Sequence, residues 1–434
     1  MNCSTLAAFR DGLYLCFNRA GDALMNAADA LLTDTTARSF VELSLSPVFE
    51  RQWPSLYEAF EDALVPRAAL VRLFAAFAPS PAPGERLVLG GDASSVLRPH
   101  SRTGRDRTYV HQSNLPEGTK PVTPGWQFST LSVLPPTPSS WTYGLDTRRI
   151  PSQKTQGEVM ADQLHAVVPQ LPQRPLFEGD GYYGSAAFLR LTEPIACDKL
   201  LRLARNRVLY RCAPPKTGIR GAPRKDGAPF QGCQPATQGV ADARFEGTDT
   251  SGQPIEVSVW HNLHFKQARH LPVSVIRVIR HGARATKRDP RVSWFVFHGQ
   301  HFPALSQIPV LYARRYSLEH AYRVDKQDLL WTAPRLRTPE QMQCWTDLVV
   351  GVRNQLFLAH QQEGLRQPWE SKSRAVTPQQ VRRAMGAIVR QLGTPARPCQ
   401  PRGKSAGRAK GTKVNTAVKY KVVFKNTKKP RQIV

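Results

Sequence analysis

The sequence predicts an α/β fold in which helical segments at both ends flank a core that contains a sheet. Three observations predict it. Residues 1–78 repeat apolar side chains at helical spacing. Between residues 86 and 180, short apolar runs are interrupted by one helical segment, and the first and last of these runs end in acidic residues. A series of β-patterned runs lies between residues 255 and 299. With 434 residues and 41% hydrophobic content, the chain can build two or three domains.

Helices are expected at both ends of the chain. Residues 1–83 are predicted to form one helical domain, which ends at the Pro-rich linker PSPAPGE. Residues 336–393 are predicted to form a second helical group, with helices over 339–362 and 377–393. Each of these two helices is preceded or opened by a Thr-Pro pair, which supplies an N-cap side chain followed by a proline at the first helical position.

The core is expected in two parts, residues 84–212 and 296–335. The first part should contain strands over 86–92, 126–134, 141–148, 176–180 and 200–211, with helices over 153–168 and from 186. Between the two parts, residues 213–295 are predicted to form a β-rich domain. Its strands should cover 255–265, 271–280 and 291–299.

The charge is strongly positive. The formal net charge is +27 and the isoelectric point is about 10.3, which indicates a polyanionic partner such as nucleic acid. The last acidic residue is Glu370, so the cations that follow it have no acidic neighbours in sequence. Residues 394–434 are expected to be a basic tail that is disordered when unbound. Basic tails alone also occur on membrane-surface and ribosome-bound proteins.

The cysteines and the N-terminus favour a cytoplasmic protein. The seven cysteines are scattered without a Cys-x-x-Cys pair, which argues against a zinc site and a disulfide framework. The N-terminal segment lacks the uninterrupted apolar run of a signal peptide. No apolar stretch is long enough to span a bilayer, so no membrane partner is expected.

One segment brings four reactive side chain types together. Tyr312, Arg315, Glu319 and Lys326 lie within fifteen residues that contain no Pro or Gly, so one helix is expected. At 3.6 residues per turn their spacing places them within an arc of about 60°. An acid that holds a metal beside cations that hold phosphates suits a metal-bound phosphodiester. The alternative is an amphipathic helix with incidental ion pairs.

Two further acids complete a possible metal site. Asp92 lies in Gly-Gly-Asp-Ala-Ser and Asp180 in Gly-Asp-Gly-Tyr-Tyr-Gly, each at the end of a predicted strand. If these strands are neighbours, the two acids meet at one edge, and a helix packed there can add Glu319. Converging carboxylates need a cation, and hard oxygen ligands select Mg²⁺, for which Mn²⁺ can substitute. Taken singly, Asp92 and Asp180 are also ordinary turn acids.

These motifs resemble a known family. The spacing Tyr-x2-Arg-x3-Glu-x6-Lys resembles the motif of the DDE transposases of bacterial insertion sequences, and the segments around Asp92 and Asp180 resemble that family's first two acidic boxes. One departure is Tyr182, where the family commonly has a small residue. The resemblance covers about residues 86–335 and implies a ribonuclease-H-like catalytic core.

The resemblance also assigns roles. It implies that Asp92, Asp180 and Glu319 are catalytic and hold two Mg²⁺ ions. It implies that Tyr312, Arg315 and Lys326 position DNA phosphates. Other cations expected to contact phosphate are Arg205 and Arg207 in the basic strand and Arg224 and Lys225 in a loop rich in Gly and Pro. A solvated loop is the alternative for this last group.

The β-rich segment 213–295 resembles an insertion of the insertion sequence four and seven-oh-one groups. In that resemblance the inserted strands grip the transposon end and receive a flipped base. Trp260 is the candidate for stacking on that base. The alternative for Trp260 is a buried aromatic residue of a strand.

The implied function is cut-and-paste transposition. A DDE transposase cleaves DNA at the transposon ends in a metal-dependent reaction and transfers the freed strands into target DNA. The partners would be double-stranded DNA with terminal inverted repeats, target DNA, and further copies of the chain in a homodimer or larger synaptic complex near the bacterial nucleoid. The alternatives are a domesticated, non-catalytic DNA-binding protein and a ribonuclease-H-like nuclease that does not join strands.

Overall fold

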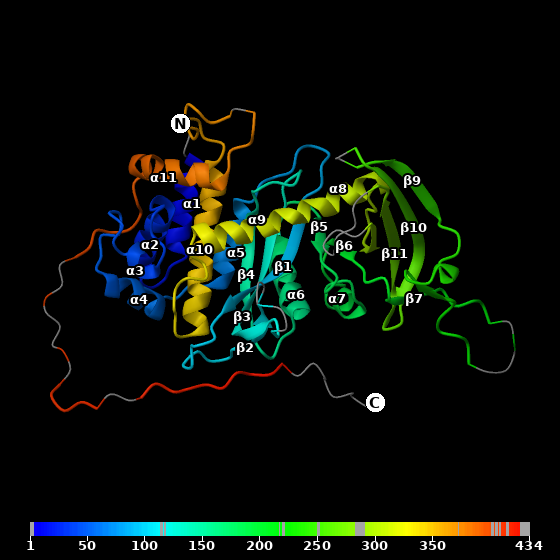
Figure 1. Cartoon of the computed structure of the whole chain (residues 1–434), viewed down its shortest axis with the longest axis horizontal. Helices are drawn as coiled ribbons and strands as arrows, with labels where there is room; N and C mark the ends of the chain where they lie inside the picture. Colours follow the sequence, from blue (N-terminus) through cyan, green and yellow to red (C-terminus); the bar gives the residue numbers. More distant parts are fainter. Residues whose placement is uncertain are drawn as a thin grey trace.

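A computed structural model provides the structure of the chain. It describes residues 4–425, except 113–115, 117–118, 217, 219–221, 250–251, 283–290, 372, 401–402, 404–406, 408 and 414–415. Helices gather at one end of the molecule and strands extend to the other (Figure 1). No helix among these residues has the length and apolar character needed to cross a membrane.

A single mixed sheet organises the centre of the molecule. Within the described residues it has 12 strands, in the order β2-β3-β1-β5-β6-β12-β11-β10-β7-β8, with β4 paired to β3 and β9 paired to β10. The strands are β1 (Val88–Leu97), β2 (Thr108–His111), β3 (Val122–Val133), β4 (Tyr143–Ile150), β5 (Leu176–Gly179), β6 (Asp198–Arg202), β7 (Val208–Arg211), β8 (Pro229–Gln231), β9 (Ala243–Thr248), β10 (Pro254–Phe265), β11 (Ala268–Arg280) and β12 (Val292–His298).

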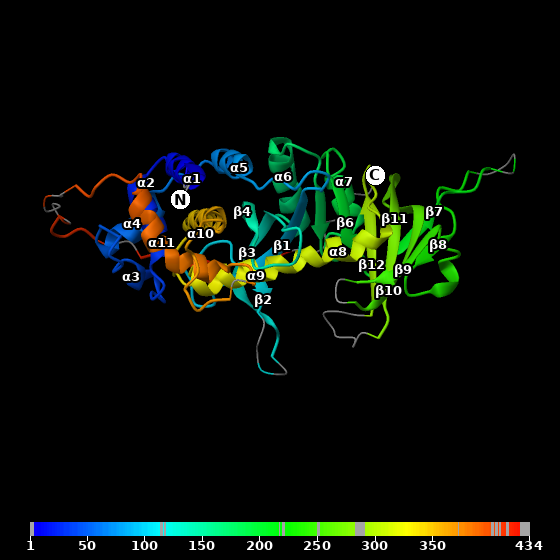
Figure 2. The same cartoon turned by 90° about the horizontal axis from the view of Figure 1, so that it is seen from above.

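The first strands form the predicted core. β3 runs antiparallel to β1 and β4, whereas β1, β5 and β6 run parallel. Helices α6 (Gln156–Val167) and α7 (Ala186–Leu191) lie on one face of this sheet, and helices α8 (Ile308–Ala313) and α9 (Ser317–Arg323) lie on the other (Figure 2). This mixed α/β arrangement is consistent with the ribonuclease-H-like core that the resemblance implies.

The β-rich segment differs from the expectation in two ways. Residues 200–211 do not form one strand, because a turn separates β6 from β7. The later strands also continue the core sheet, since β12 pairs antiparallel with β6 through Phe295–Arg202 to His298–Lys199. The hydrogen-bonded ladder therefore runs without a break from the core into the β-rich segment.

The helices of the two chain ends pack together. They are α1 (Ser4–Leu15), α2 (Gly21–Thr33), α3 (Phe40–Leu43), α4 (Trp53–Asp62), α5 (Arg67–Ala76), α10 (Pro339–Ala359) and α11 (Pro378–Leu392). The predicted N-caps of the last two are confirmed, because Thr338 and Thr377 each accept a hydrogen bond from the amide three residues on. A Cβ atom at Gly351 of α10 would lie 3.0 Å from Leu13 of α1, so these two helices approach closely.

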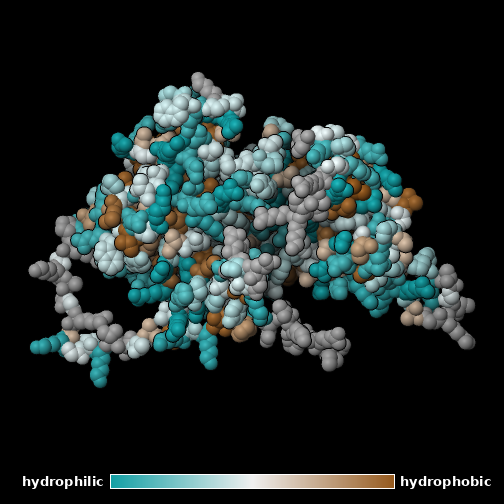
Figure 3. Space-filling model, in the orientation of Figure 1, coloured by the Kyte–Doolittle hydropathy of each residue, from teal (hydrophilic) through white to brown (hydrophobic). Residues whose placement is uncertain are grey.

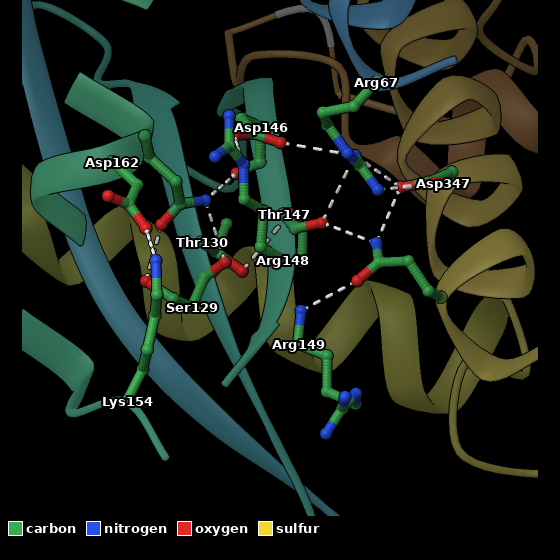
Figure 4. A network of polar contacts seen from close by, with 12 residues as sticks. Arg67, Ser129, Thr130, Asp146, Thr147, Arg148, Arg149, Lys154, Asp162 and Asp347 are labelled. Carbon is green, nitrogen blue, oxygen red and sulfur yellow. Dashed lines mark hydrogen bonds and ion pairs between the residues drawn. The ribbon is translucent and has the colours of Figure 1, made fainter. Parts of the chain in front are cut away.

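A buried polar network joins the helices to the sheet (Figure 4). Arg67 of α5 donates two hydrogen bonds to the carboxylate of Asp347 in α10, at 2.7 and 2.8 Å, and a third to Asp146 of β4 at 3.2 Å. Gln343 of α10 also donates to the Thr147 carbonyl at 2.8 Å. One arginine thus connects segments from the first, middle and last parts of the sequence.

The tail also contacts the core, where disorder was expected. The Tyr420 and Val423 amides donate to the carbonyls of Arg102 and Arg107 at 2.8 and 2.7 Å. The buried Arg107 side chain donates in return to the Tyr420 carbonyl at 3.1 Å. Residue Val423 forms a parallel bridge with Thr108 at the start of β2. This short part of the tail therefore contacts the edge of the sheet at β2 through an isolated bridge.

Candidate active site

The motif segment is one helical run with irregular turns. Helix α8 continues into a 3-10 turn, η4 (Arg314–Tyr316), then α9, then a π-helical turn, η5 (Val324–Asp328). The run lies in front of β1 and β5 (Figure 1). The prediction of a continuous helix is therefore correct, but that of a regular 3.6-residue period is wrong. The wider π turn changes the direction in which Lys326 projects.

Strand alternation shows which residues face this helix. Val88 of β1, Leu176 of β5 and Leu200 of β6 form one apolar cluster with residues of α8 and α9. Because side chains alternate along a strand, every second residue from these three points to the same face. The polar residues that share this face are Asp92 and Ser94 of β1, Glu178 of β5 with Asp180 just after it, and Asp198 and Arg202 of β6.

The strand register places three of these residues in one row. Gly90 of β1 pairs with Glu178 of β5, and Gly179 of β5 pairs with Leu201 of β6. Continuing these registers by two residues and one residue brings Asp92, Asp180 and Arg202 to the same level. Adjacent strands lie about 4.8 Å apart. Asp180 directly follows β5, as expected, but Asp92 lies inside β1, which continues to Leu97, so the expectation that Asp92 ends its strand is wrong.

Arg315 pairs with the first acid. Its Nη2 atom lies 3.1 Å from Oδ1 of Asp92, and both side chains are partly buried. Burial raises the pKa of Asp92, Arg315 opposes that rise, and the charges of Asp180 and Glu319 raise the pKa further. The three predicted acids therefore share one electrostatic environment.

The third predicted acid, Glu319, lies on the helix that covers the sheet. Glu319 lies in the first turn of α9 and its side chain is exposed. Within the described residues, no three His, Cys, Asp or Glu side chains are close enough to hold one metal ion. The chemistry of the donor set nevertheless fits a divalent cation, because the acids offer hard carboxylate oxygens and repel one another without one.

Tyr312 and Lys326 border the same space. Tyr312 packs against Phe295 with ring centroids 4.6 Å apart, and burial raises its pKa, with further contributions from Asp180 and Glu178. The Lys326 ammonium lies 5.9 Å from the ring centroids of Tyr322 and Trp331. Burial lowers the pKa of Lys326, whereas the charges of Asp325 and Asp92 oppose that change.

The turn that follows β5 requires the particular residue types found around Asp180. Oδ1 of Asp180 accepts a hydrogen bond from the Tyr182 amide at 2.9 Å, which fixes the carboxylate in the turn. Tyr183 is buried, and its hydroxyl accepts a hydrogen bond from Gln156 at 2.9 Å. A Cβ atom at position 184 would lie 2.2 Å from the Arg202 carbonyl oxygen, so only glycine fits there.

Sequence reasoning missed Glu178. It lies inside β5, is fully buried, and has no hydrogen-bond partner on either carboxylate oxygen within the described part of the chain. Burial raises the pKa of Glu178 well above its usual value, against the effect of Arg314 and Arg315. The one signal in the sequence was an acid inside an apolar strand, Leu-Phe-Glu-Gly-Asp.

The other candidate DNA contacts lie farther along the sheet. Arg205 and Arg207 are exposed in the turn between β6 and β7, and Arg224 and Lys225 are exposed in the loop before β8. Trp260 differs from its expected role. It is 2% exposed and packs against Trp294 and Phe230, with centroids 5.8 and 5.3 Å away, and the Arg277 guanidinium lies 5.6 Å from its ring centroid. The ring has no free face for a base, so the alternative of a buried strand aromatic holds.

Comparison with known families identifies the class of protein. A family model described as DDE superfamily endonuclease matches residues 12–262. This match covers more than half of the chain, so the chain belongs to the DDE superfamily endonucleases. It includes β1 and β5, with Asp92 and Asp180, and ends before the helix that carries Glu319. No curated protein matches the chain.

Membership of this superfamily indicates transposase-type nuclease activity with DNA as the substrate. Enzymes of the superfamily generally use divalent metals. The coarser expectation from the sequence, a DDE enzyme that acts on DNA, is therefore confirmed.

Proposed function

We propose that this chain is a cut-and-paste transposase of the insertion sequence four or seven-oh-one type. It cleaves DNA at the transposon ends and joins the freed 3′ strands to target DNA in the bacterial nucleoid. The observation that carries this proposal is the common row of Asp92 and Asp180 on adjacent parallel strands, beneath the helix that carries Glu319.

Asp92, Asp180 and Glu319 are the residues that would hold two Mg²⁺ ions. When bound, such ions activate the attacking oxygen and stabilise charge on the phosphate. The exposed side chain of Glu319 and the partly exposed side chain of Asp92 leave this region open to solvent. DNA can therefore reach it from the side of α9.

Cations around the acids would position the DNA. Arg315 offers a planar donor set suited to phosphate, and Lys326 offers a point charge held over two rings. Tyr312 would contribute a hydroxyl contact. The face that carries α8 and α9 is largely hydrophilic (Figure 3), as expected for contact with a phosphate backbone.

Recognition of the transposon end would use other parts of the chain. The N-terminal helices within residues 1–83 would bind the terminal inverted repeat. The exposed Arg205, Arg207, Arg224 and Lys225 would contact phosphates flanking it. A homodimer or larger complex would bring two ends together.

The test is a gel assay with transposon-end DNA and Mg²⁺. Asp92→Ala, Asp180→Ala and Glu319→Ala should each abolish cleavage and leave end binding near the wild-type level, because binding depends on cations elsewhere. Glu193→Ala is a matched control, since Glu193 is an exposed acid that pairs with His270 away from the row. An Asp180→Ala protein that still cuts would remove the basis of the proposal.

A second assay separates the proposal from its alternatives. Pre-cut transposon ends should be joined to target DNA by the wild-type protein. Cleavage without joining would identify a nuclease that lacks strand transfer. Binding without either reaction would identify a DNA-binding protein derived from a transposase.

A further inference from the structure

Trp369 is a tryptophan that the fold leaves uncovered. Six of the eight tryptophans are at most 6% exposed, whereas Trp369 is 80% exposed. Trp53, the other exposed tryptophan, packs edge-on against Tyr57. Within the described residues the Trp369 ring stacks on no other ring, and its indole nitrogen donates no hydrogen bond. Because large aromatic side chains are enriched at binding surfaces, a ring exposed to this extent indicates a partner outside the chain.

A fixed turn presents this ring to solvent. Trp369 is the third residue of a turn that begins at Gln367, whose carbonyl accepts a hydrogen bond from the Glu370 amide at 3.0 Å. The Glu370 carboxylate accepts a hydrogen bond from the Gln367 amide at 3.0 Å and forms an ion pair with Arg383 of α11. Pro368 occupies the second position, where its restricted φ suits a turn. The turn is therefore ordered before any partner binds, which lowers the entropic cost of binding.

The turn lies beside the motif helix. It belongs to the loop between α10 and α11, which in both views is next to the C-terminal end of that helix (Figures 1 and 2). Gln361 and Ala375, near the two ends of the loop, line one cavity together with Arg314 of the motif helix. After the loop, Gln379 donates to the Asp328 carboxylate at 3.2 Å, where the motif helix ends. A partner bound at the turn therefore lies on the same side of the molecule as the motif helix.

The charges around the ring favour an anionic partner. Between residues 366 and 374 the sequence has three cations, Arg366, Lys372 and Arg374, and one acid, Glu370, which is already paired with α11. Within the described residues neither of these arginines is paired with an acid. An exposed ring among unpaired cations is typical of surfaces that bind single-stranded nucleic acid, where bases stack on the ring and cations contact phosphates. Bases within a duplex already stack on their neighbours, so the ring needs an unpaired base.

We propose that Trp369 is a stacking platform for an unpaired DNA base, and that Arg366 and Arg374 contact the adjoining phosphates. The base belongs to a single strand that leaves the duplex beside the bond to be cleaved or joined. This inference rests on the proposed function only for the position of that bond. Trp369 touches DNA away from the reacting atoms, so it is a positioning residue.

The experiment measures DNA binding by fluorescence anisotropy, with the full-length chain and without divalent cations, so that no strand is cut. The probes are a blunt duplex, the same duplex with a single-stranded overhang, and that overhang with abasic sites in place of its bases. The wild type should bind the overhang with bases about tenfold more tightly than the abasic overhang. Trp369→Ala should remove this difference and should bind the blunt duplex like the wild type.

Further variants separate stacking from apolar contact and from charge. Trp369→Phe keeps a ring and should retain most of the difference between the two overhangs, whereas Trp369→Leu should lose it. Arg374→Ala should weaken binding of both overhangs alike and reduce the salt dependence of binding. Val240→Ala is the matched control, because Val240 is an apolar residue 84% exposed in the bend before β9. All of these side chains are exposed, so melting temperatures should stay at the wild-type value.

Two results would overturn the inference and leave the proposed function intact, provided that cleavage depends on Asp180. If the wild type binds the two overhangs equally, or if Trp369→Ala weakens both alike, no base stacks on the ring. If Trp369→Ala instead turns a dimer into a monomer in sedimentation without DNA, a second copy of the chain covers the ring. A third result separates the two proposals in the other direction. If Trp369→Ala removes the difference while Asp180→Ala still cuts, the ring is a DNA contact and the proposed active site is wrong.

Discussion

Lys326 has an unusual environment for a cation. The π turn that contains it directs the ammonium over the rings of Tyr322 and Trp331, and the charge of Asp92 acts on it. Aromatic faces attract a cation without neutralising it. The lysine is therefore held in place with its charge available to a phosphate.

Lys326→Met tests this arrangement. Methionine keeps most of the apolar stem and removes the charge, so folding should be unchanged and joining of pre-cut transposon ends should fall about tenfold or more. Lys266→Met is the matched control, because Lys266 is exposed in the turn between β10 and β11. Equal joining rates for both variants would mean that Lys326 only packs against the rings.

Gly184→Ala tests the turn that holds Asp180. The added methyl would lie 2.2 Å from a backbone oxygen of β6, and a backbone atom cannot move away as a side chain can. The variant should lose about 1–3 kcal/mol of unfolding free energy and most of its cleavage activity. The control is Gly181→Ala, whose Cβ would lie 4.0 Å from the same oxygen. Similar unfolding midpoints for the two variants would contradict the prediction.

The site residues that were predicted belong to motifs with a distinctive spacing in the sequence, whereas the residue that was missed belongs to no such motif. Asp92, Asp180 and the four motif residues can each be recognised from the few residues around them in the sequence. Glu178 was missed because a single acid in an apolar strand has no distinctive spacing. The pairing of Arg315 with Asp92 was also beyond prediction, since it depends on how a helix more than 200 residues later packs on β1.

Helices and strands were predicted correctly where the local sequence pattern determines them. Helices α6, α10 and α11 follow from apolar periodicity and capping residues, and their predicted ends are within a few residues of those observed. Among the core strands, β1 continues to Leu97 beyond its predicted end at residue 92, and the strand predicted over 200–211 is divided into β6 and β7. The pairing of β12 with β6 was missed because strand partners are chosen by tertiary packing. The Val-Lys-Tyr-Lys-Val-Val-Phe pattern in the tail is β-like, but the positive charge of the tail obscured it.

The docked part of the tail gives a prediction at the scale of an element. Val423→Pro removes the amide that bonds to the Arg107 carbonyl, so the segment should detach from β2. Deuterium exchange over residues 417–424 should then become faster, with an unchanged melting temperature. Val418→Pro, at an exposed position before the contact, is the control. Unchanged exchange in Val423→Pro would show that the two hydrogen bonds do not hold the tail.

At the scale of the whole molecule, Arg67 is the main polar connection. Its partners Asp146 and Asp347 are both buried, and burial raises the pKa of Asp347 to about 6. Without the arginine, Asp146 would keep its ion pair with Arg148, but the buried Asp347 carboxylate would keep only the hydrogen bond from Gln343. The helices from both chain ends and the sheet should therefore unfold as one unit.

Arg67→Ala should cost about 3 kcal/mol of unfolding free energy, the low end of the range for a broken buried pair, because the Arg67 side chain is 27% exposed. The loss of unfolding free energy should be smaller in the double variant Arg67→Met/Asp347→Leu, because both charges of this ion pair are removed together. Urea unfolding followed by circular dichroism and by Trp fluorescence should give one shared transition. Two separate transitions would show that the helices and the sheet unfold independently.

The close packing of α10 on α1 has a consequence for synthesis of the protein. The first helices leave the ribosome long before α10, which they need as a partner. At usual translation rates the 305 residues between α2 and α10 take roughly 15–60 s to make. During that time the parts of α1 and α2 that pack on α10 and α11 have no permanent cover, so we expect the nascent chain to need chaperones until these two helices emerge. Messages truncated at their 3′ ends would yield chains for proteolysis rather than partly active fragments.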